Sequence, residues 1–195
     1  MIIAIDTETG GLDSNKNALL SISACFLDNP KKTFNVFIEP APDTTIEPEA
    51  AAVNGYTPEE WKKRGAVPLL TALQKFKAWL PYSGNEPLAH NAPFDKGFIE
   101  AAEKRANFNL YLKKRWRCSM ALFMGVNDAL RLNSPDFKLV TLAGMAGHGT
   151  EFQKGTHQSL DDVIACAAGW KWLIERIRHG DNPADLAPPK TEAKV

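Results

Sequence analysis

The amino-acid sequence predicts an α/β domain in which a mixed sheet is flanked by helices. Three apolar segments suited to strands come first, over residues 2–6, 19–27 and 33–39. Helix-like segments then alternate with single strand-like segments as far as residue 178. Short turn-rich connections favour antiparallel pairing of the first three strands, whereas strands separated by helices pair in parallel.

The individual segments carry the local signals of these elements. Asn29-Pro30-Lys31-Lys32 has turn chemistry and predicts a hairpin between the second and third strands. Residues 66–79 have apolar side chains at helical spacing, and Pro81 and Gly84 end that helix. The remaining predictions are short helical pieces near 48–52 and 58–64, a buried strand within 86–91, and helices over 92–107, 118–130, 138–146 and 159–178.

Composition is that of an ordinary globular protein, with 44% hydrophobic and 24% charged residues. We expect a single domain over residues 1–180 and a loose, polar, Pro-rich tail over 181–195. No apolar run approaches the about 20 residues that span a bilayer, so no membrane segment is expected. The formal net charge of zero argues against a protein that coats nucleic acid by bulk charge, but not against an enzyme that holds one strand end.

The cysteines give a further expectation about the compartment. Cys25, Cys118 and Cys166 lie far apart and lack the spacing of a structural zinc site or a disulfide framework. We interpret them as reduced core residues. No basic region precedes the first apolar residues, so a signal peptide is not expected. Together with the reduced cysteines, this predicts a cytoplasmic location.

A pair of acidic residues interrupts the first apolar strand, in the stretch IAIDTETGGL over residues 3–12. Because side chains alternate along a strand, Asp6 and Glu8 project from one face at its carboxyl end, where open α/β sheets place ligands. Two like charges at this spacing are tolerated when they are solvated or bridged by a cation. Taken alone, the pair favours a solvated strand end.

Two further acidic motifs change that interpretation. In HNAPFD, Asp95 is either a plain helix-start acid, favoured by the helix dipole, or a third carboxylate beside the first two. In HQSLDD, His157 and Asp162 converge only if His157 lies in the loop before the helix. Ser159 and Asp162 also match a helix-capping pattern, and Asp161 is the neighbouring alternative to Asp162.

Four carboxylates without a cysteine or histidine ligand cluster suit a hard cation such as Mg²⁺ or Mn²⁺. An oxygen-only site of this kind serves two-metal phosphoryl chemistry. A neutral histidine beside the attacking water acts as a general base in such chemistry. The acidic motifs therefore predict a metal-dependent hydrolase of phosphate esters.

In this order the motifs resemble those of the DEDDh (DnaQ-like) 3′→5′ exonucleases, which include the proofreading subunit of bacterial replicases. The resemblance spans residues 1–178, and His157 in place of tyrosine indicates the DEDDh branch. It implies an RNase H-like fold and two divalent ions, Mg²⁺ or Mn²⁺. It also implies that Asp6, Glu8 and Asp162 bind one ion directly, that Asp6 holds the second, and that Asp95 acts mainly through water. His157 would orient and deprotonate the attacking water.

The same resemblance implies contacts with the terminal nucleotide. The turn after the first strand would bring the backbone around Thr7, Glu8 and Thr9 to it. Leu12 is either a wedge against the last bases or an ordinary core leucine, and Asn54 stands where relatives commonly carry histidine. The candidates for substrate contact are Thr7, Thr9, Leu12, Ala50, Val53, Asn54 and Phe94.

These expectations converge on a metal-dependent 3′→5′ exonuclease that releases nucleoside 5′-monophosphates from single-stranded or frayed DNA. The alternative is an exoribonuclease of the same superfamily acting on short RNA or RNA 3′ ends, since no reader of the 2′-hydroxyl is identifiable. A non-catalytic nucleic-acid-binding or polymerase-docking module ranks below both, because all four acids and the histidine are present. We expect a stand-alone nuclease or the separate partner of a polymerase subunit. The basic stretch KKRWR, residues 113–117, either contacts strand phosphates or forms a solvated loop.

Overall fold

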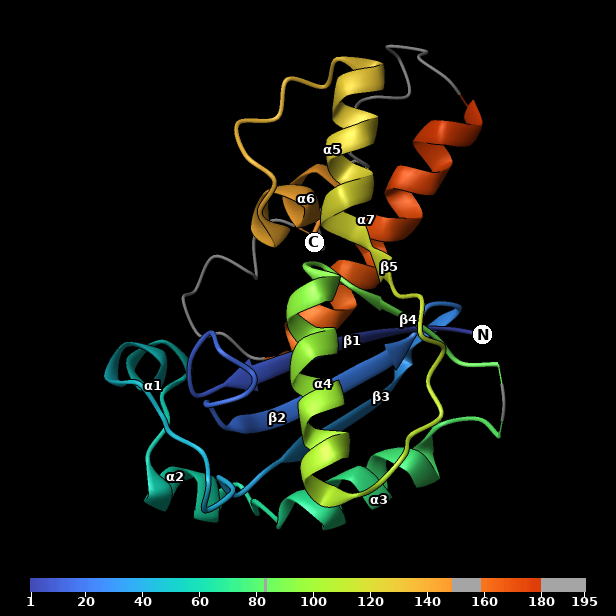
Figure 1. Cartoon of the computed structure of the whole chain (residues 1–195). Coiled ribbons are helices and arrows are strands. Elements are labelled where there is room, and N and C mark those ends of the chain that lie inside the picture. Colours follow the sequence, from blue (N-terminus) through green and yellow to red (C-terminus); the bar gives the residue numbers. More distant parts are fainter. Residues whose placement is uncertain (83, 149–158, 180–195) are drawn as a thin grey trace, which may run out of the picture.

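The structure is a computed structural model of the chain and describes residues 1–82, 84–148 and 159–179. A five-stranded sheet with strand order β3-β2-β1-β4-β5 forms its centre (Figure 1). The first three strands pair antiparallel, β4 pairs in parallel with β1, and β5 pairs in parallel with β4. The predicted mixed sheet is therefore confirmed. The strands are β1 (Ile2–Thr9), β2 (Leu19–Phe26), β3 (Asn29–Phe37), β4 (Glu86–Ala89) and β5 (Arg117–Cys118).

Helices cover both faces of this sheet (Figure 1). Helices α3 and α4 pack on one face, α7 packs on the other, and α5 and α6 pack against α7. The helices are α1 (Pro48–Asn54), α2 (Pro58–Lys63), α3 (Leu69–Trp79), α4 (Ala92–Ala106), α5 (Ser119–Leu130), α6 (Leu139–Met145) and α7 (Ser159–His179). The result is a three-layer arrangement of helices, sheet and helices.

Alternation along β1 assigns its side chains to the two layers. Ile3 and Ile5 belong to the cluster of buried residues that includes Phe98 of α4. Ala4 belongs to a second cluster, which includes Cys166 of α7. Because alternate residues of a strand share a face, Asp6 and Glu8 lie on the α7 side, and Thr7 lies on the α4 side.

The hairpin between β2 and β3 differs from the prediction. The turn lies at Leu27 and Asp28, and β3 begins already at Asn29, so the proposed turn at residues 29–32 is wrong. The pairing shifts register between Cys25 and Phe26, which brings Phe26 opposite Asn29. Strand β3 lies at the edge of the sheet, and an edge strand tolerates a proline that has no N–H to donate.

Helix α3 also begins later than predicted. Val67 forms an isolated bridge with Ile38, its N–H donates to the carbonyl of Phe37, and Pro68 precedes the first helical residue, Leu69. Val67 is therefore held in extended backbone. Strand β5 was not predicted, because two residues are too few to leave a periodic pattern.

Other expectations about the chain have mixed outcomes. Cys25 and Cys166 are free and buried as expected, whereas Cys118 is free and half-buried. Within the residues that the structure describes, no helix combines the length and apolar character needed to cross a membrane. The expected tail, residues 181–195, lies outside the described residues.

Candidate active site

Strand β1 extends beyond the end of its neighbour β4. Its pairing with β4 ends where Ala4 meets Leu88, whereas β2 accompanies it as far as Thr9. The last residues of β1 therefore have an edge without a strand neighbour. Backbone N–H groups along such an edge need other partners when they are buried.

Asp95 supplies one of these partners. It lies in the first turn of α4, as predicted, and its side chain is buried. One carboxylate oxygen, Oδ1, accepts hydrogen bonds from the Thr7 N–H at 3.0 Å and from the Thr7 hydroxyl at 2.9 Å. Asp95 is thereby fixed against the open edge of β1.

The remaining carboxylates meet on the other side of β1. Asp6 and Glu8 extend toward α7, where Asp162 lies in the first turn. One carboxylate oxygen from each of these three residues lies within 4.8 Å of the other two, and all three side chains are half-buried. Asp95 is not part of this group. His157, the predicted general base, lies outside the described residues.

Burial and mutual repulsion raise the pKa values of Asp6 and Glu8, and burial raises that of Asp95. Burial raises the pKa of Asp6 well above its ordinary value, and Asp95, Asp162 and Glu8 raise it further. Burial, Asp162 and Asp95 raise the pKa of Glu8 to about 7, while a hydrogen bond with Asn54 opposes them. Burial raises the pKa of Asp95 to about 7, against the two hydrogen bonds from Thr7. Full ionisation of the group near neutral pH therefore calls for a compensating cation.

The donor set suits such a cation. Three carboxylates within reach of one another offer only oxygen ligands, and the group contains neither cysteine nor histidine among the described residues. Hard divalent ions such as Mg²⁺ and Mn²⁺ prefer oxygen ligands. The residues present therefore fit the divalent metal that the sequence predicts.

The segment that leads into α1 closes over the end of β1. The Glu47 N–H donates to the Gly10 carbonyl at 2.6 Å, and a Cβ on Gly10 would lie 2.7 Å from the Thr45 carbonyl oxygen. A Cβ on Gly11 would come within 2.5 Å of the Asn17 side chain. The chain's own residues thus pack closely against both glycines at the end of β1.

This chain is similar in sequence to known exonucleases. The model of the exonuclease family, RNase_T, matches residues 3–168. This chain belongs to the DEDDh exonuclease family. Ribonuclease T from Shewanella sp. strain MR-4 is 34% identical over 203 residues, which cover 91% of this chain and 83% of that protein.

Other members of the exonuclease family match over a shorter stretch. Ribonuclease T from Shewanella baltica strain OS155 is 35% identical over 119 residues, or 54% of this chain, and the chain spans 53% of that relative's length. Ribonuclease T from Escherichia coli strain K12 is also 35% identical over 119 residues, which cover 54% of this chain and 55% of that protein. The chain thus spans about half the length of these two curated relatives.

Solved exonucleases share the fold. The zinc-bound complex of E. coli exonuclease I with single-stranded DNA superposes with a TM-score of 0.72 at 19% identity, covering 91% of this chain and 41% of that one. Exonuclease I from Methylocaldum szegediense gives a TM-score of 0.70 at 21% identity, covering 91% of this chain and 40% of that one. The sheet described above is the RNase H-like fold of these exonucleases.

The seven residues singled out for substrate contact differ in their surroundings in this exonuclease domain. Leu12 is 84% exposed and Val53 58% exposed, so the alternative that Leu12 is a core leucine is wrong. Ala50 is half-buried. Phe94 is half-buried and packs against Phe98, with ring centroids 5.1 Å apart. Leu12 and Val53 are therefore the members of this set with the most open side chains.

The other three candidates take part in hydrogen bonds within the chain. Thr7 donates to Asp95 as described, and the Thr9 hydroxyl donates to the Gly11 carbonyl at 2.7 Å. The Asn54 amide donates to the Thr9 carbonyl at 2.8 Å, and the Asn54 side chain also bonds Glu8. Asn54 thus ties the end of α1 to the end of β1 and to one of the carboxylates.

Sequence reasoning missed a chain of polar contacts that starts at His90, just after β4 of this exonuclease fold. His90 Nε2 donates to the Phe137 carbonyl at 2.9 Å, so its Nδ1 accepts from the Ser119 hydroxyl, also at 2.9 Å. The Ser119 oxygen lies 3.5 Å from Cys166 Sγ, and burial lowers the pKa of His90. This neutral chain connects the end of β4, the start of α5 and the middle of α7. The signal for it was His90 in the HNAPFD motif.

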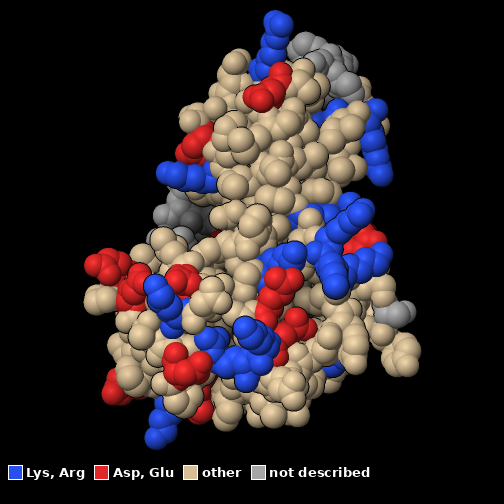
Figure 2. Space-filling model, viewed as in Figure 1, with Lys and Arg blue, Asp and Glu red and all other residues tan. Residues whose placement is uncertain are grey.

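Two of the four basic residues in the stretch at residues 113–117 form salt bridges. Lys113 and Arg117 both form salt bridges with Glu86, the latter at 2.6 Å. These contacts hold the pKa of Glu86 at about 2. Figure 2 shows Lys and Arg interspersed with Asp and Glu over this face of the molecule. For Lys113 and Arg117 the pairing fits a solvated, ion-paired segment that leads into β5.

Proposed function

We propose that this protein is a metal-dependent 3′→5′ exonuclease that releases nucleoside 5′-monophosphates from single-stranded or frayed DNA ends. The observation that carries the proposal is the group of Asp6, Glu8 and Asp162, with carboxylate oxygens within 4.8 Å of one another at the end of β1. Membership of the exonuclease family supports the reaction class. Exonuclease I, which shares the fold, is bound to single-stranded DNA in its solved complex, and this supports DNA as the substrate.

The carboxylates would hold two divalent cations, Mg²⁺ or Mn²⁺. Asp6, Glu8 and Asp162 would bind the first ion, Asp6 would also bind the second, and Asp95 would act on it through water. When bound, such ions neutralise charge on the phosphate and activate water for attack. His157 would take a proton from the attacking water as a general base.

The rest of the chain orients these groups. The two hydrogen bonds from Thr7 fix Asp95 beside β1, and the bond from Asn54 restrains Glu8. Leu12 and Val53 present exposed apolar side chains that would pack against the last bases, since base faces are apolar and polarisable. The backbone at Thr7 and Thr9, Ala50, and Phe94 remain the other proposed substrate contacts.

RNA 3′ ends are the second candidate substrate. The relatives that match over most of the chain are named Ribonuclease T, and that name is the observation in favour of RNA. Labelled DNA and RNA strands of the same sequence, offered separately and in competition, distinguish the two. If RNA is shortened faster than DNA, RNA becomes the proposed substrate, and the proposed exonuclease reaction is unchanged.

The catalytic assignment is tested by comparing two adjacent aspartates. The parent, Asp6→Asn, Asp162→Asn and Asp161→Asn are incubated with 5′-labelled single strands in Mg²⁺, Mn²⁺ or EDTA. Changes in the outer partners of metal sites cost ~10–100-fold, so loss of a direct ligand is expected to slow the 3′-end ladder by more than about 100-fold. Asp161 is exposed, and its variant should stay within about twofold of the parent.

Folding of each variant is checked by circular dichroism, so that a loss of activity is not a loss of structure. Undiminished cleavage by Asp162→Asn, or a ladder that persists in EDTA, would contradict the metal-dependent mechanism.

A further inference from the structure

A cavity of about 480 Å³ lies along helix α7, apart from the carboxylate group. Ile164 lines this cavity, whereas Asp162 belongs to the acidic site. Residues two apart on a helix project from nearly opposite sides, so the two sites lie on different faces of α7. The lining residues are Pro30, Ala146, His148, Ile164, Ala168, Lys171, Trp172, Glu175 and Arg176.

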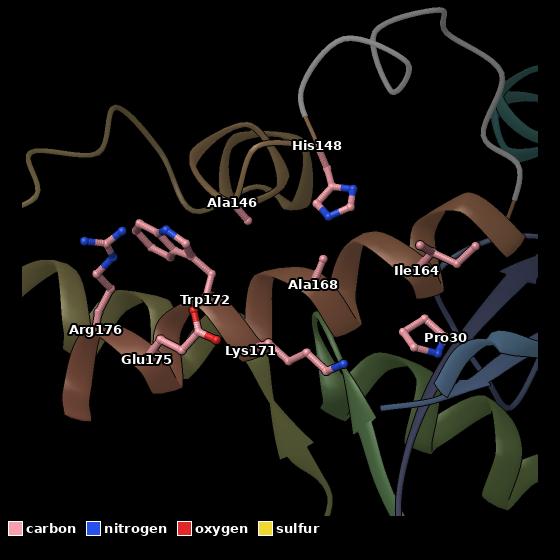
Figure 3. A pocket seen from close by; sticks show the side chains of 9 residues that line it. All are labelled: Pro30, Ala146, His148, Ile164, Ala168, Lys171, Trp172, Glu175 and Arg176. Atoms are coloured by element: carbon pink, nitrogen blue, oxygen red, sulfur yellow. The ribbon is translucent and has the colours of Figure 1, made fainter. Parts of the chain in front are cut away.

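The cavity has the shape of a slot (Figure 3). Helix α7 forms its floor, and Ala146 and His148, which follow α6, lie across from that floor. The indole of Trp172 lies toward one end, while the Lys171 side chain extends toward Pro30 at the other. Ala168 lies between them. The volume is within the ~300–1,000 Å³ of small-molecule sites, and such sites combine mainly apolar walls with a few polar groups.

One polar group in this wall is unsatisfied. Trp172 is 8% exposed, and its Nε1 has no hydrogen-bond partner within the described part of the chain. The Arg176 guanidinium lies 5.0 Å from the centre of the same ring. A buried donor without an acceptor costs free energy, and a ligand that brings an acceptor removes that cost. This end of the slot therefore suits an acceptor atom.

The opposite end suits an anion. Lys171 forms no salt bridge with any described residue, and its side chain lies half-buried along the slot. Ala168 gives the space between the two ends an apolar surface, and Pro30 and Ile164 lie at the Lys171 end. The complementary ligand is a planar ring that carries a hydrogen-bond acceptor on one side and an anionic group on the other.

We propose that this slot binds a free nucleoside 5′-monophosphate, as a second nucleotide site separate from the carboxylates. The base lies over Ala168 beside the His148 ring, an acceptor on the base meets Trp172 Nε1, and the phosphate meets Lys171. The choice of a nucleotide among ring-bearing anions rests on the proposed function, because the exonuclease releases such molecules.

The test reads the unsatisfied indole directly. Uniformly ¹⁵N-labelled full-length protein in EDTA is titrated with thymidine 5′-monophosphate, and the tryptophan indole N–H signals are followed by NMR. The Trp172→Phe variant assigns the Trp172 signal, which should move downfield and saturate as Nε1 gains an acceptor. No cleavage is involved, so the result is independent of the nuclease assay, and Asp6→Asn should bind equally well.

Two variants and a matched control define the site. Ala168→Leu fills the slot and should abolish the shift. Lys171→Gln should weaken binding of the monophosphate by roughly tenfold while leaving thymidine, which lacks the phosphate, unaffected. Arg178→Gln removes an exposed cation of the same helix outside the slot and should bind like the parent.

Several outcomes would overturn the proposal. A Trp172 signal that stays fixed at millimolar nucleotide excludes the site. Equal weakening by Lys171→Gln and Arg178→Gln would mean diffuse charge attraction. A shift with oligothymidylate but not with the monophosphate would make the slot a strand contact and not a site for free nucleotide.

Discussion

Thr7 shows how one residue serves both the fold and the acidic site. Strand β4 stops short of it, so its backbone N–H lacks a strand partner, and Asp95 accepts from that N–H and from the hydroxyl with the same oxygen. These bonds satisfy the open edge of β1. They also oppose the burial that raises the pKa of Asp95 to about 7. Thr7 therefore both stabilises β1 and favours the ionised form of Asp95.

Thr7→Val tests this double role, because valine keeps the shape of threonine and removes its hydroxyl. Loss of a buried hydrogen bond to a carboxyl group should lower the free energy of unfolding by about 1–3 kcal/mol. Urea denaturation in EDTA measures the change. Thr7→Ser keeps the hydroxyl and is the matched control, and equal losses in the two variants would show that the hydroxyl contributes nothing.

The sequence predicted the acidic residues but not what fixes them. Asp6 and Glu8 follow from the alternation of a strand, and Asp95 from its place in the first turn of a helix. The bond from Thr7 to Asp95 depends on where β4 ends relative to β1, and that register is not written in either segment. Asn54 was read as a substrate residue from resemblance, whereas its contacts with Thr9 and Glu8 come from the docking of α1 on β1.

Whole elements were predicted best where burial imposes a long period. Helix α7 matches its expected range within one residue at its end, and the first three strands have the expected pairing. The errors fall where local chemistry and tertiary context disagree. Residues 29–32 have the composition of a turn, yet they lie in the edge strand β3. Residues 66–68 continue the helical pattern, yet Val67 forms a bridge with Ile38, and its N–H donates to the carbonyl of Phe37 at the end of β3.

Two glycine-to-alanine substitutions should change the free energy of unfolding in opposite directions. Gly10→Ala places a Cβ 2.7 Å from the Thr45 carbonyl oxygen, so the segment before α1 must shift, at an expected cost of about 1–3 kcal/mol. Gly125 lies within α5 with no atom within 4 Å of an added Cβ, so Gly125→Ala should stabilise by about 0.5–1 kcal/mol. Urea unfolding of both variants beside the parent measures the two signs, and a stabilised Gly10→Ala would contradict the close packing of residues 45–47 on β1.

At the scale of the whole molecule, folding gathers acidic groups that the unfolded chain keeps apart. The chain has a formal net charge of zero, and both charge signs are interspersed on the face shown in Figure 2, so the concentration of like charge at the acidic site is local. Three layers meet at that point: β1 supplies Asp6 and Glu8, α4 supplies Asp95 and α7 supplies Asp162. Assembly of the layers therefore raises carboxyl pKa values, and protons or cations must compensate.

This coupling predicts how stability depends on pH and on metal. The pKa values of Glu8 and Asp95 rise to about 7 in the folded chain from 4.5 and 3.8, so the folded state retains protons that the unfolded state has lost. Stability from these groups is full below the unfolded values and is lost as pH rises through about 7. In EDTA, the free energy of unfolding should fall between pH 6.5 and 8, by on the order of 1 kcal/mol per group.

The choice of window separates this effect from other titrations. Burial lowers the pKa of His90 from 6.5, so the titration of His90 makes stability rise with pH, in the region below its ordinary pKa. The pKa of Glu86 is about 2, so its titration changes stability only in acid. Mg²⁺ competes with the retained protons, so it should raise the melting temperature more at pH 8 than at pH 6.5. Asp162→Asn removes a charge that raises the pKa of Glu8 and should flatten both trends. Stability in EDTA that is constant or rising from pH 6.5 to 8 would show that the folded chain does not hold these protons.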